Sequence, residues 1–356
     1  MKTKTCSSQA ALTYGSQPAL RDRLVLEAAR LDAPDVVLAV TRRGKRTVVT
    51  GGRGPEPATP REALRYELGS LTKTYTVLLL ATLAAEGVLT QDDRLAAHLP
   101  PTLRLPHRAS HSITLRHLAT HTAGLPRLPY ALVPGALLRP YRSGYARYDT
   151  ERLLNAFAAT RPLHPAGRRW AYSNFGAALL GPALARAAAV AYPALLGTRV
   201  LRPLGLTGTT LGPGPEGADA VGYRADGRTP VPATDMGAFC AAGAVRATPH
   251  DMLSYLEALL NPAGSSLSGP LKEVQVPQLH RGGRRGETHT LTWFQHPAPG
   301  GPLLFHAGAT FGQQAFCGYH PASGTGLAAV ATARGRRCPL VPVAYELLYQ
   351  LAEEGH

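Results

Sequence analysis

Ser70 and Lys73 are the residues whose types and spacing point most directly to chemistry. They stand three positions apart, just before the apolar run at 77–81. A helix that starts near Gly69 and stops at Gly87 places such residues on one face, so the lysine amine can approach the serine hydroxyl. Free N–H groups at the helix N-terminus suit an oxyanion formed beside Ser70. The pair therefore predicts a serine nucleophile activated by an amine.

Taken alone, this spacing is a weak signal, because a solvated serine and lysine on a helix surface would look the same. The basic residues of the chain make the signal stronger. Of the 38 basic residues only five are lysines, and the rest are arginines. A lysine in an apolar turn, where arginine is the usual cation of this chain, indicates an amine that can lose its proton.

Two later motifs carry further polar groups. Tyr172 and Asn174 form Tyr-x-Asn before an apolar helical run, and His306 and Gly308 form His-x-Gly at the end of an apolar, strand-like segment. Each motif has a structural alternative when taken alone. Tyr172 and Asn174 could begin a helix with Asn174 as its N-cap, and His306 could be a hydrogen-bonded core histidine.

The three motifs in this order resemble those of the serine β-lactamase and penicillin-binding-protein superfamily. The resemblance is to its class C branch, which also contains esterases and D-amino-acid peptidases. Residues 113–126, 203–207 and 241–248 resemble that branch too, and the likeness covers about residues 35–350. It implies an α+β fold, in which an antiparallel sheet flanked by helices is built from both chain ends and carries an inserted all-helical domain.

The resemblance also implies a catalytic role for three residues. Ser70 would attack an acyl carbon and form an acyl-enzyme, while Lys73 would hold and share the serine proton. Tyr172 would take a proton during attack and return it to the leaving group. Since the ordinary pKa of tyrosine is about 10, Lys73 and His306 would have to lower it or share the proton.

Other motif residues would bind the substrate. Asn174 would orient Lys73 and the substrate, and Gly308 would let the strand backbone approach the acyl group. The N–H groups of Ala309 and Ser70 would form the oxyanion hole. We expect His306 to titrate between about pH 5 and 8 and to favour anionic substrates on the acid side of that range.

The segment 306–309 departs from the Lys-Thr-Gly pattern of true β-lactamases, which is often followed by a hydroxyl residue. Here the cation is a histidine, and Ala307 and Ala309 occupy the hydroxyl positions. A substrate carboxylate would lose two or three hydrogen bonds of about 1.5–3 kcal/mol each. Efficient β-lactam turnover is therefore not expected, and esters or amides without that carboxylate fit better.

The leading hypothesis is a serine hydrolase or acyltransferase that acts on small-molecule ester, amide or peptide substrates. One alternative is a low-efficiency β-lactamase or a D-amino-acid peptidase. An alternative of another class is a non-hydrolytic acyl-binding or penicillin-sensor protein, which Tyr172 and Asn174 argue against because deacylation needs a base. The oligomeric state is not predicted.

Composition excludes several other classes. The formal charge is +15, but the arginines form only short clusters without aromatic residues, so nucleic acid is not expected as a partner. Thirteen histidines without H-E-x-x-H and four cysteines without C-x-x-C spacing predict no metal, cofactor or disulfide. The N-terminus lacks the apolar core of a signal peptide, and no apolar run reaches 18 residues. A cytoplasmic protein without a membrane span is expected.

The segments that must position these residues follow from periodicity and turn signals. We expect an N-terminal segment at 1–34, a sheet domain from 35–91 and 216–356, and an inserted helical domain at 92–215. The expected strands are 36–40, 47–50, 289–296, 302–306, 313–319 and 326–332. The expected helices are 114–120, 149–159, 175–190, 192–201, 249–260 and 341–353, besides the one at Ser70. Residues 208–235 and 262–288 are expected to be irregular connections.

Overall fold

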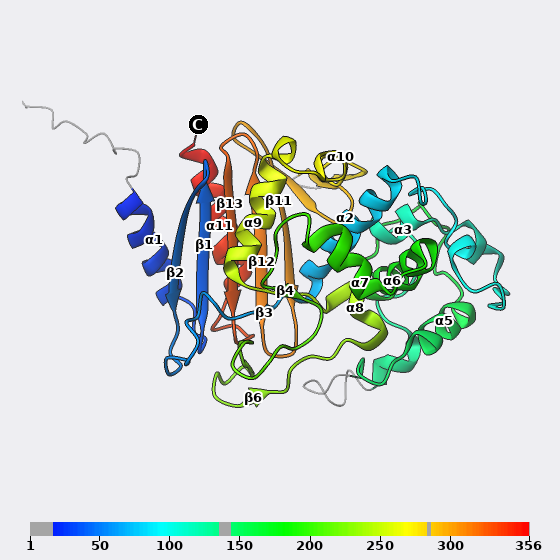
Figure 1. Ribbon diagram of the computed structural model, residues 1–356, viewed down its shortest axis with the longest axis horizontal. Coiled ribbons are helices and arrows are strands. Elements are labelled where there is room, and N and C mark those ends of the chain that lie inside the picture. The colour runs from blue at the N-terminus through cyan, green and yellow to red at the C-terminus, as the bar shows by residue number, and fades with distance from the viewer. Residues whose placement is uncertain (1–16, 135–143, 283–285, 356) are drawn as a thin grey trace, which may run out of the picture.

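The computed structural model describes residues 17–134, 144–282 and 286–355 (Figure 1). The first ten residues, which include Cys6 and on which the expectation about export depends, lie outside these ranges. Residues 283–285, part of one of the short basic clusters (281–285), also lie outside them.

The central element is an antiparallel sheet of eight strands, in the order β2-β1-β13-β12-β11-β10-β9-β8. Residue Val36 of β1 pairs with Ala331 of β13, so the two ends of the chain join in the middle of one sheet, as predicted. The strands are β1 (Val36–Arg42), β2 (Lys45–Gly51), β8 (Leu279–Gly282), β9 (Glu287–His289), β10 (Phe294–Ala298), β11 (Gly301–Ala309), β12 (Gln314–His320) and β13 (Thr325–Ala331).

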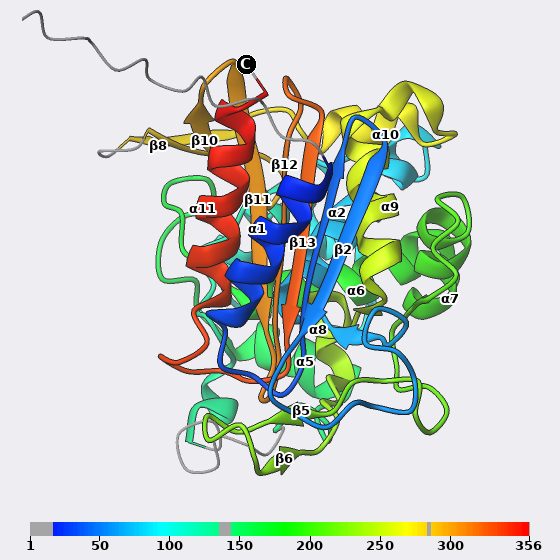
Figure 2. The same ribbon diagram turned by 90° about the vertical axis from the view of Figure 1, so that its left-hand side faces the viewer.

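Helices cover both faces of this sheet. Successive side chains of a strand point to opposite faces, so the apolar strands of the sheet need a packed layer on each side. Leu38 belongs to the core under α1 (Gln17–Ala29) and α11 (Leu340–Glu353), which Figure 2 shows side by side on one face. Its neighbour Val37 belongs to the larger core on the opposite face, with α2 (Thr72–Ala85) and α9 (Pro249–Leu260). Thr248 caps α9 and Pro249 begins it, as predicted.

The remaining helices lie mostly on the α2 side of the sheet (Figure 1). They are α3 (Leu115–Ala119), α5 (Thr150–Ala159), α6 (Asn174–Ala188), α7 (Tyr192–Leu196), α8 (Cys240–Gly243) and α10 (Ser268–Glu273). Single helical turns occur at Gly69–Leu71, Leu95–His98, Arg108–Ser112, Tyr130–Leu132, Gly197–Leu201, Gly237–Phe239 and Pro262–Gly264. Short strands form two small sheets, β3 (Tyr66–Glu67) with β7 (Arg246–Ala247) and β4 (Thr209–Thr210), and β5 (Gly222–Tyr223) with β6 (Pro230–Val231).

Four sequence expectations were wrong, one of them the irregular connection at 208–235, which contains β4, β5 and β6. Helix α1 was not predicted, because exposed Val25 and Leu26 obscure the spacing of its buried residues. The strand expected at 289–296 is two strands, since the chain turns at 290–293 to bury Trp293 against Tyr319. The irregular stretch at 262–288 contains α10 and β8.

Candidate active site

Ser70 lies on the helical turn between β3 and α2, so helical conformation begins at Gly69 as predicted. Gly69 has φ +51°, which glycine adopts without strain. Strand β11 runs directly against this turn. A side chain at Gly308 would collide with the carbonyl oxygen of Leu68 and come within 2.9 Å of the Ser70 nitrogen. The strand and the serine turn therefore touch backbone to backbone.

Lys73 is buried in α2 and donates two hydrogen bonds. One reaches Ser70 Oγ at 3.0 Å, and the other reaches the carbonyl oxygen of Ala242 on α8 at 2.8 Å. Burial lowers the pKa of Lys73, and the charge of Arg127 lowers it further, while Tyr172 opposes the shift. The amine is therefore easier to deprotonate than an ordinary lysine, which suits a proton acceptor for a serine.

Tyr172 also reaches Ser70, because its hydroxyl donates a hydrogen bond to Ser70 Oγ at 2.6 Å. Its ring centre lies 5.1 Å from Lys73 Nζ and 4.5 Å from the ring centre of His121. His121 packs behind Tyr172 and accepts a hydrogen bond from the Ser173 nitrogen, so it supports the cleft wall. A hydroxyl that contacts both an amine and a phenol can lose a proton to one of them and return it through the other.

Asn174 is the first residue of α6, and its neighbour Ser173, rather than Asn174, caps the helix by accepting a hydrogen bond from Gly176. Asn174 lines the same cleft as Ser70. Its buried side-chain oxygen has no hydrogen-bond partner among the described residues. The two hydrogen bonds of Lys73 go to Ser70 and Ala242, so no bond from Asn174 orients the amine in this structure.

His306 lies on β11 and lines the cleft, but its predicted titration between pH 5 and 8 is wrong. The side chain is 1 % exposed, and within the described ranges neither ring nitrogen has a hydrogen-bond partner. Burial lowers the pKa of His306 to about 3, with the nearby charge of Lys73 as a second cause. The imidazole is therefore neutral over the expected range, and it offers one donor and one acceptor instead of a cation.

Ala309 is the last residue of β11, where the strand leaves the sheet toward β12. Its backbone packs against Gly69, since a side chain at Gly69 would come within 2.7 Å of the Ala309 nitrogen. The backbones of Ala309 and Ser70 thus lie close together at one edge of the cleft, where the sequence analysis expects the oxyanion hole.

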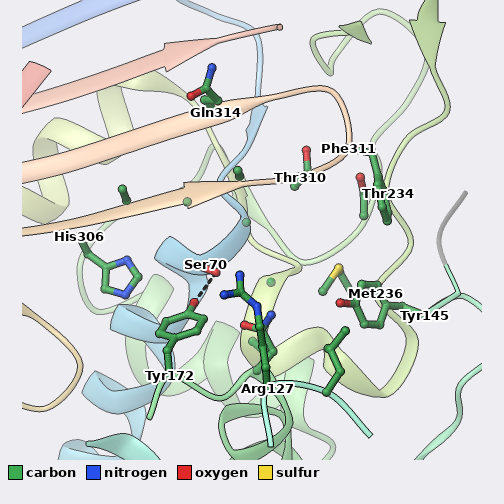
Figure 3. Close-up of a pocket in the computed structure, with 18 of the residues that line it drawn as sticks. Ser70, Arg127, Tyr145, Tyr172, Thr234, Met236, His306, Thr310, Phe311 and Gln314 are labelled. Atoms are coloured by element: carbon green, nitrogen blue, oxygen red, sulfur yellow. Dashed lines mark hydrogen bonds between the residues drawn. The ribbon is translucent and has the colours of Figure 1, made fainter. Parts of the chain in front are cut away.

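The cleft has a volume of about 660 Å³ and joins all the predicted substrate-binding residues to Ser70 and Tyr172 (Figure 3). Sequence reasoning missed several of its lining residues, which come from loops and strands far apart in the chain: Arg127, Tyr145, Thr234, Met236, Phe294, Phe305, Thr310, Gln314 and Arg334. Only Arg127 and Thr310 had a sequence signal, because each directly follows a stretch singled out above.

The described residues include neither a cluster of metal ligands nor a single membrane-spanning helix. No three His, Cys, Asp or Glu side chains gather there as a metal site would need. No single described helix has the length and apolar content to cross a membrane, although the bent pair Asn174–Ala188 and Tyr192–Leu201 passes by length and composition.

Comparison with known proteins finds one family. The model of the family described as Beta-lactamase matches residues 24–345. Over 195 residues, the chain is 34% identical to the D-alanyl-D-alanine-carboxypeptidase/endopeptidase AmpH of Escherichia coli K12, covering 54% of this chain and 48% of the relative. It is 30% identical over 253 residues to a beta-lactamase of Lysobacter lactamgenus, covering 69% of this chain and 60% of the relative. The chain thus spans about half to three fifths of these relatives.

A solved structure shows the same fold along nearly the whole chain. The beta-lactamase/D-alanine carboxypeptidase of Yersinia pestis, in complex with citrate, superposes with a TM-score of 0.81 at 23% identity. The match covers 96% of this chain and all of that one.

Proposed function

This chain belongs to the beta-lactamase family, and from that premise we propose that it hydrolyses ester and small amide or peptide bonds through an acyl-enzyme at Ser70. One observation carries the proposal. Ser70 Oγ accepts hydrogen bonds from both the Tyr172 hydroxyl at 2.6 Å and the Lys73 amine at 3.0 Å. A nucleophile with two proton carriers in contact can complete both halves of an acyl-transfer cycle.

In the proposed first half, Lys73 in its neutral form accepts the Ser70 proton while Oγ attacks the acyl carbon. The N–H groups of Ser70 and Ala309 stabilise the oxyanion. Tyr172 gives its proton to the leaving group and recovers one from Lys73. In the second half, water attacks the acyl-enzyme and gives its proton to Tyr172 while Tyr172 passes its own proton to the neutral Lys73. Lys73 then returns that proton to Ser70 Oγ, which leaves as a hydroxyl.

The substrate class follows from what β11 offers. Ala307 and Ala309 supply no hydroxyl, and His306 is neutral, so β11 itself offers no cation to a carboxylate on the leaving-group side. We therefore propose slow β-lactam turnover relative to esters. The name of the AmpH relative supports peptide bonds as a second substrate class. Transfer of the acyl group to a nucleophile other than water would use the same steps.

We also propose that residues 35–91, 92–215 and 216–356 act as one catalytic unit. Residues from each part line the cleft, with Ser70 from the first, Tyr172 from the second and His306 from the third. Separating the sheet and helical parts would then remove the site.

The test combines a fluorophosphonate probe with a panel of p-nitrophenyl esters, D-amino-acid amides and nitrocefin. We expect Ser70→Ala to abolish probe labelling and to lower turnover by at least about 10³-fold. Ser112→Ala, at an exposed serine outside the cleft, is the matched control. Covalent labelling of the Ser70→Ala protein would contradict the assignment. A burst without steady-state turnover in the wild type would favour the acyl-binding sensor instead.

A further inference from the structure

We infer that the part of the cleft across Ser70 from His306 is a subsite for an acyl group that carries a carboxylate, recognised by Arg127, Arg334 and Thr310. The inference rests on the proposed acyl-enzyme at Ser70 and names the acyl group that this site would take.

The chemistry of the site decides which side of Ser70 holds the acyl group. Tyr172 protonates the leaving group in the proposed cycle, so the leaving group departs on the side of Tyr172. His306 lies on that side in Figure 3, while Thr310, Thr234 and Met236 lie on the other. The acyl group that stays on Ser70 therefore extends toward Thr310, with Arg127 projecting between the two sides (Figure 3).

Arg127 is an exposed cation that lines the cleft without a counter-charge among the described residues. Its backbone is fixed, since its carbonyl oxygen accepts a hydrogen bond from the Phe175 nitrogen at 3.2 Å, and that of Pro126 accepts one from Ser173 Oγ at 2.7 Å. Its guanidinium carbon lies 5.4 Å from the Tyr172 ring centre. Within the described ranges Arg127 forms no ion pair, and the residues outside them include no Asp or Glu that could provide one.

Thr310 and Arg334 form the opposite wall of this part of the cleft. The Thr310 side chain is 7 % exposed, and its hydroxyl is a buried group without a hydrogen-bond partner among the described residues. Arg334 donates a hydrogen bond from Nη1 to the Thr310 carbonyl oxygen at 2.6 Å, which holds the guanidinium beside the same residue. A buried unpaired hydroxyl next to a guanidinium is suited to an anionic oxygen of a ligand.

The charged residues that line the cleft favour an anionic ligand over a cationic one. The described residues that line it include two arginines and neither Asp nor Glu. Asp235 is the acidic residue nearest in the sequence to a lining residue, since it stands between Thr234 and Met236. It is exposed, and its carboxylate accepts a hydrogen bond from the Gly237 nitrogen. A carboxylate fits because it can accept the paired N–H donors of a guanidinium.

The test compares two p-nitrophenyl esters of glutaric acid that differ only in the far carboxyl group, one free and one capped as its methyl ester. We expect the wild type to favour the free acid by about 10-fold or more in kcat/KM, and Arg127→Gln to lower that preference by about 10- to 100-fold. Arg127→Lys, which keeps the charge but loses the paired donors, should restore part of it. Arg161→Gln, at an exposed arginine outside the cleft, is the control for net charge.

A second measurement compares ligand binding at the subsite in a protein that cannot turn the ligand over. In the Ser70→Ala protein, glutaryl-p-nitroanilide should bind about 10-fold more tightly than its methyl-capped form, and Arg127→Gln should remove the difference. Equal binding of the two compounds, or equal effects of Arg127→Gln and Arg161→Gln on either preference, would overturn the inference. Ser70-dependent hydrolysis of the capped ester would still support the proposed function. A wild type that cleaves neither ester and escapes the fluorophosphonate would instead contradict the proposed function, while the binding difference would still test the subsite.

Discussion

Two groups of buried polar residues lie close to Ser70, and they differ in how their polar atoms are satisfied. In the first, Arg246 bridges Glu67 at 2.8 Å and Asp219 at 3.7 Å. Glu67 also accepts hydrogen bonds from the nitrogen and the hydroxyl of Thr234, at 2.7 and 2.8 Å. We call these four residues the charge cluster.

The second group lines the cleft. Buried polar atoms of Asn174, His306 and Thr310 have no partner in the described part of the chain. Leaving such atoms unpaired costs about 1–3 kcal/mol each, and these three residues line the cleft, where a ligand could pair them. The charge cluster holds the loop of Thr234 to the strand before Ser70. In the cleft, by contrast, the unpaired polar atoms lower the stability of the fold but remain available to a ligand. Substitutions in the two groups should therefore have opposite effects on stability and activity.

The largest effect is expected at Lys73, which lies buried behind Ser70 and has hydrogen bonds to Ser70 and Ala242. Lys73→Arg keeps the charge but cannot accept a proton from Ser70. We expect kcat/KM for a p-nitrophenyl ester to fall about 10³-fold, close to the loss in Lys73→Ala. Near-normal activity of the arginine variant would mean that Lys73 acts only as a fixed cation and that Tyr172 alone is the base.

In the charge cluster, Glu67→Ala should mainly affect stability. The substitution leaves Arg246 buried with a single, more distant carboxylate, that of Asp219. We expect a loss of about 3 kcal/mol in the free energy of unfolding, measured by urea denaturation. Glu62→Ala, outside the cluster, is the control. An unchanged free energy of unfolding would show that the cluster does not hold this region together.

For His306 the expected effect is on the pH dependence of stability. Its pKa is lowered to about 3 in the folded protein, against 6.5 ordinarily, so the unfolded chain takes up the proton first. Stability is therefore lost as pH falls from about 6.5 toward 3, with a slope of about 1.4 kcal/mol per pH unit. The measurement is the free energy of unfolding, from urea titrations at several pH values. In His306→Asn, the number of protons taken up on unfolding in this pH range should fall by about one. An unchanged slope would mean that the folded protein accommodates a charged His306.

The smallest effect is expected at Thr310. Thr310→Val replaces an unpaired buried hydroxyl with a methyl group of the same shape. The free energy of unfolding should stay the same or rise by up to about 1 kcal/mol, while the preference for an acyl carboxylate falls several-fold. A clear loss of stability, measured by urea denaturation, would place Thr310 with the structural group.

Comparing the expected with the observed structure at particular residues shows which features the sequence could predict. Ser70 and Lys73 lie on one local helical turn, so their spacing alone predicts their contact. The strand segments at 36–40 and 326–332 are short apolar runs of the kind typical of strands buried on both faces, which made the joint sheet predictable. The turn at 290–293 was hidden, because its residues continue the alternation until Trp293 turns inward.

The rest of the cleft depends on long-range packing. Arg127, Thr310 and Arg334 come from three separate loops, and no local pattern indicates that their side chains meet. The neutral state of His306 likewise follows from burial beside Lys73, which spacing along the chain cannot show. Residue identity alone therefore suggested a titrating histidine.

The joining of both chain ends in one sheet has a consequence for how the protein is made. Strand β1 is buried in the finished sheet, yet its partner β13 lies about 290 residues later. At about 5–20 residues per second, a ribosome needs roughly 15–60 s to reach β13 after it has made β1. Through that interval the apolar segment Val36–Val40 has only β2 to pair with, and its other edge stays open. Completion of the sheet must wait until β13 has been made, so this sheet cannot form strand by strand as the chain emerges.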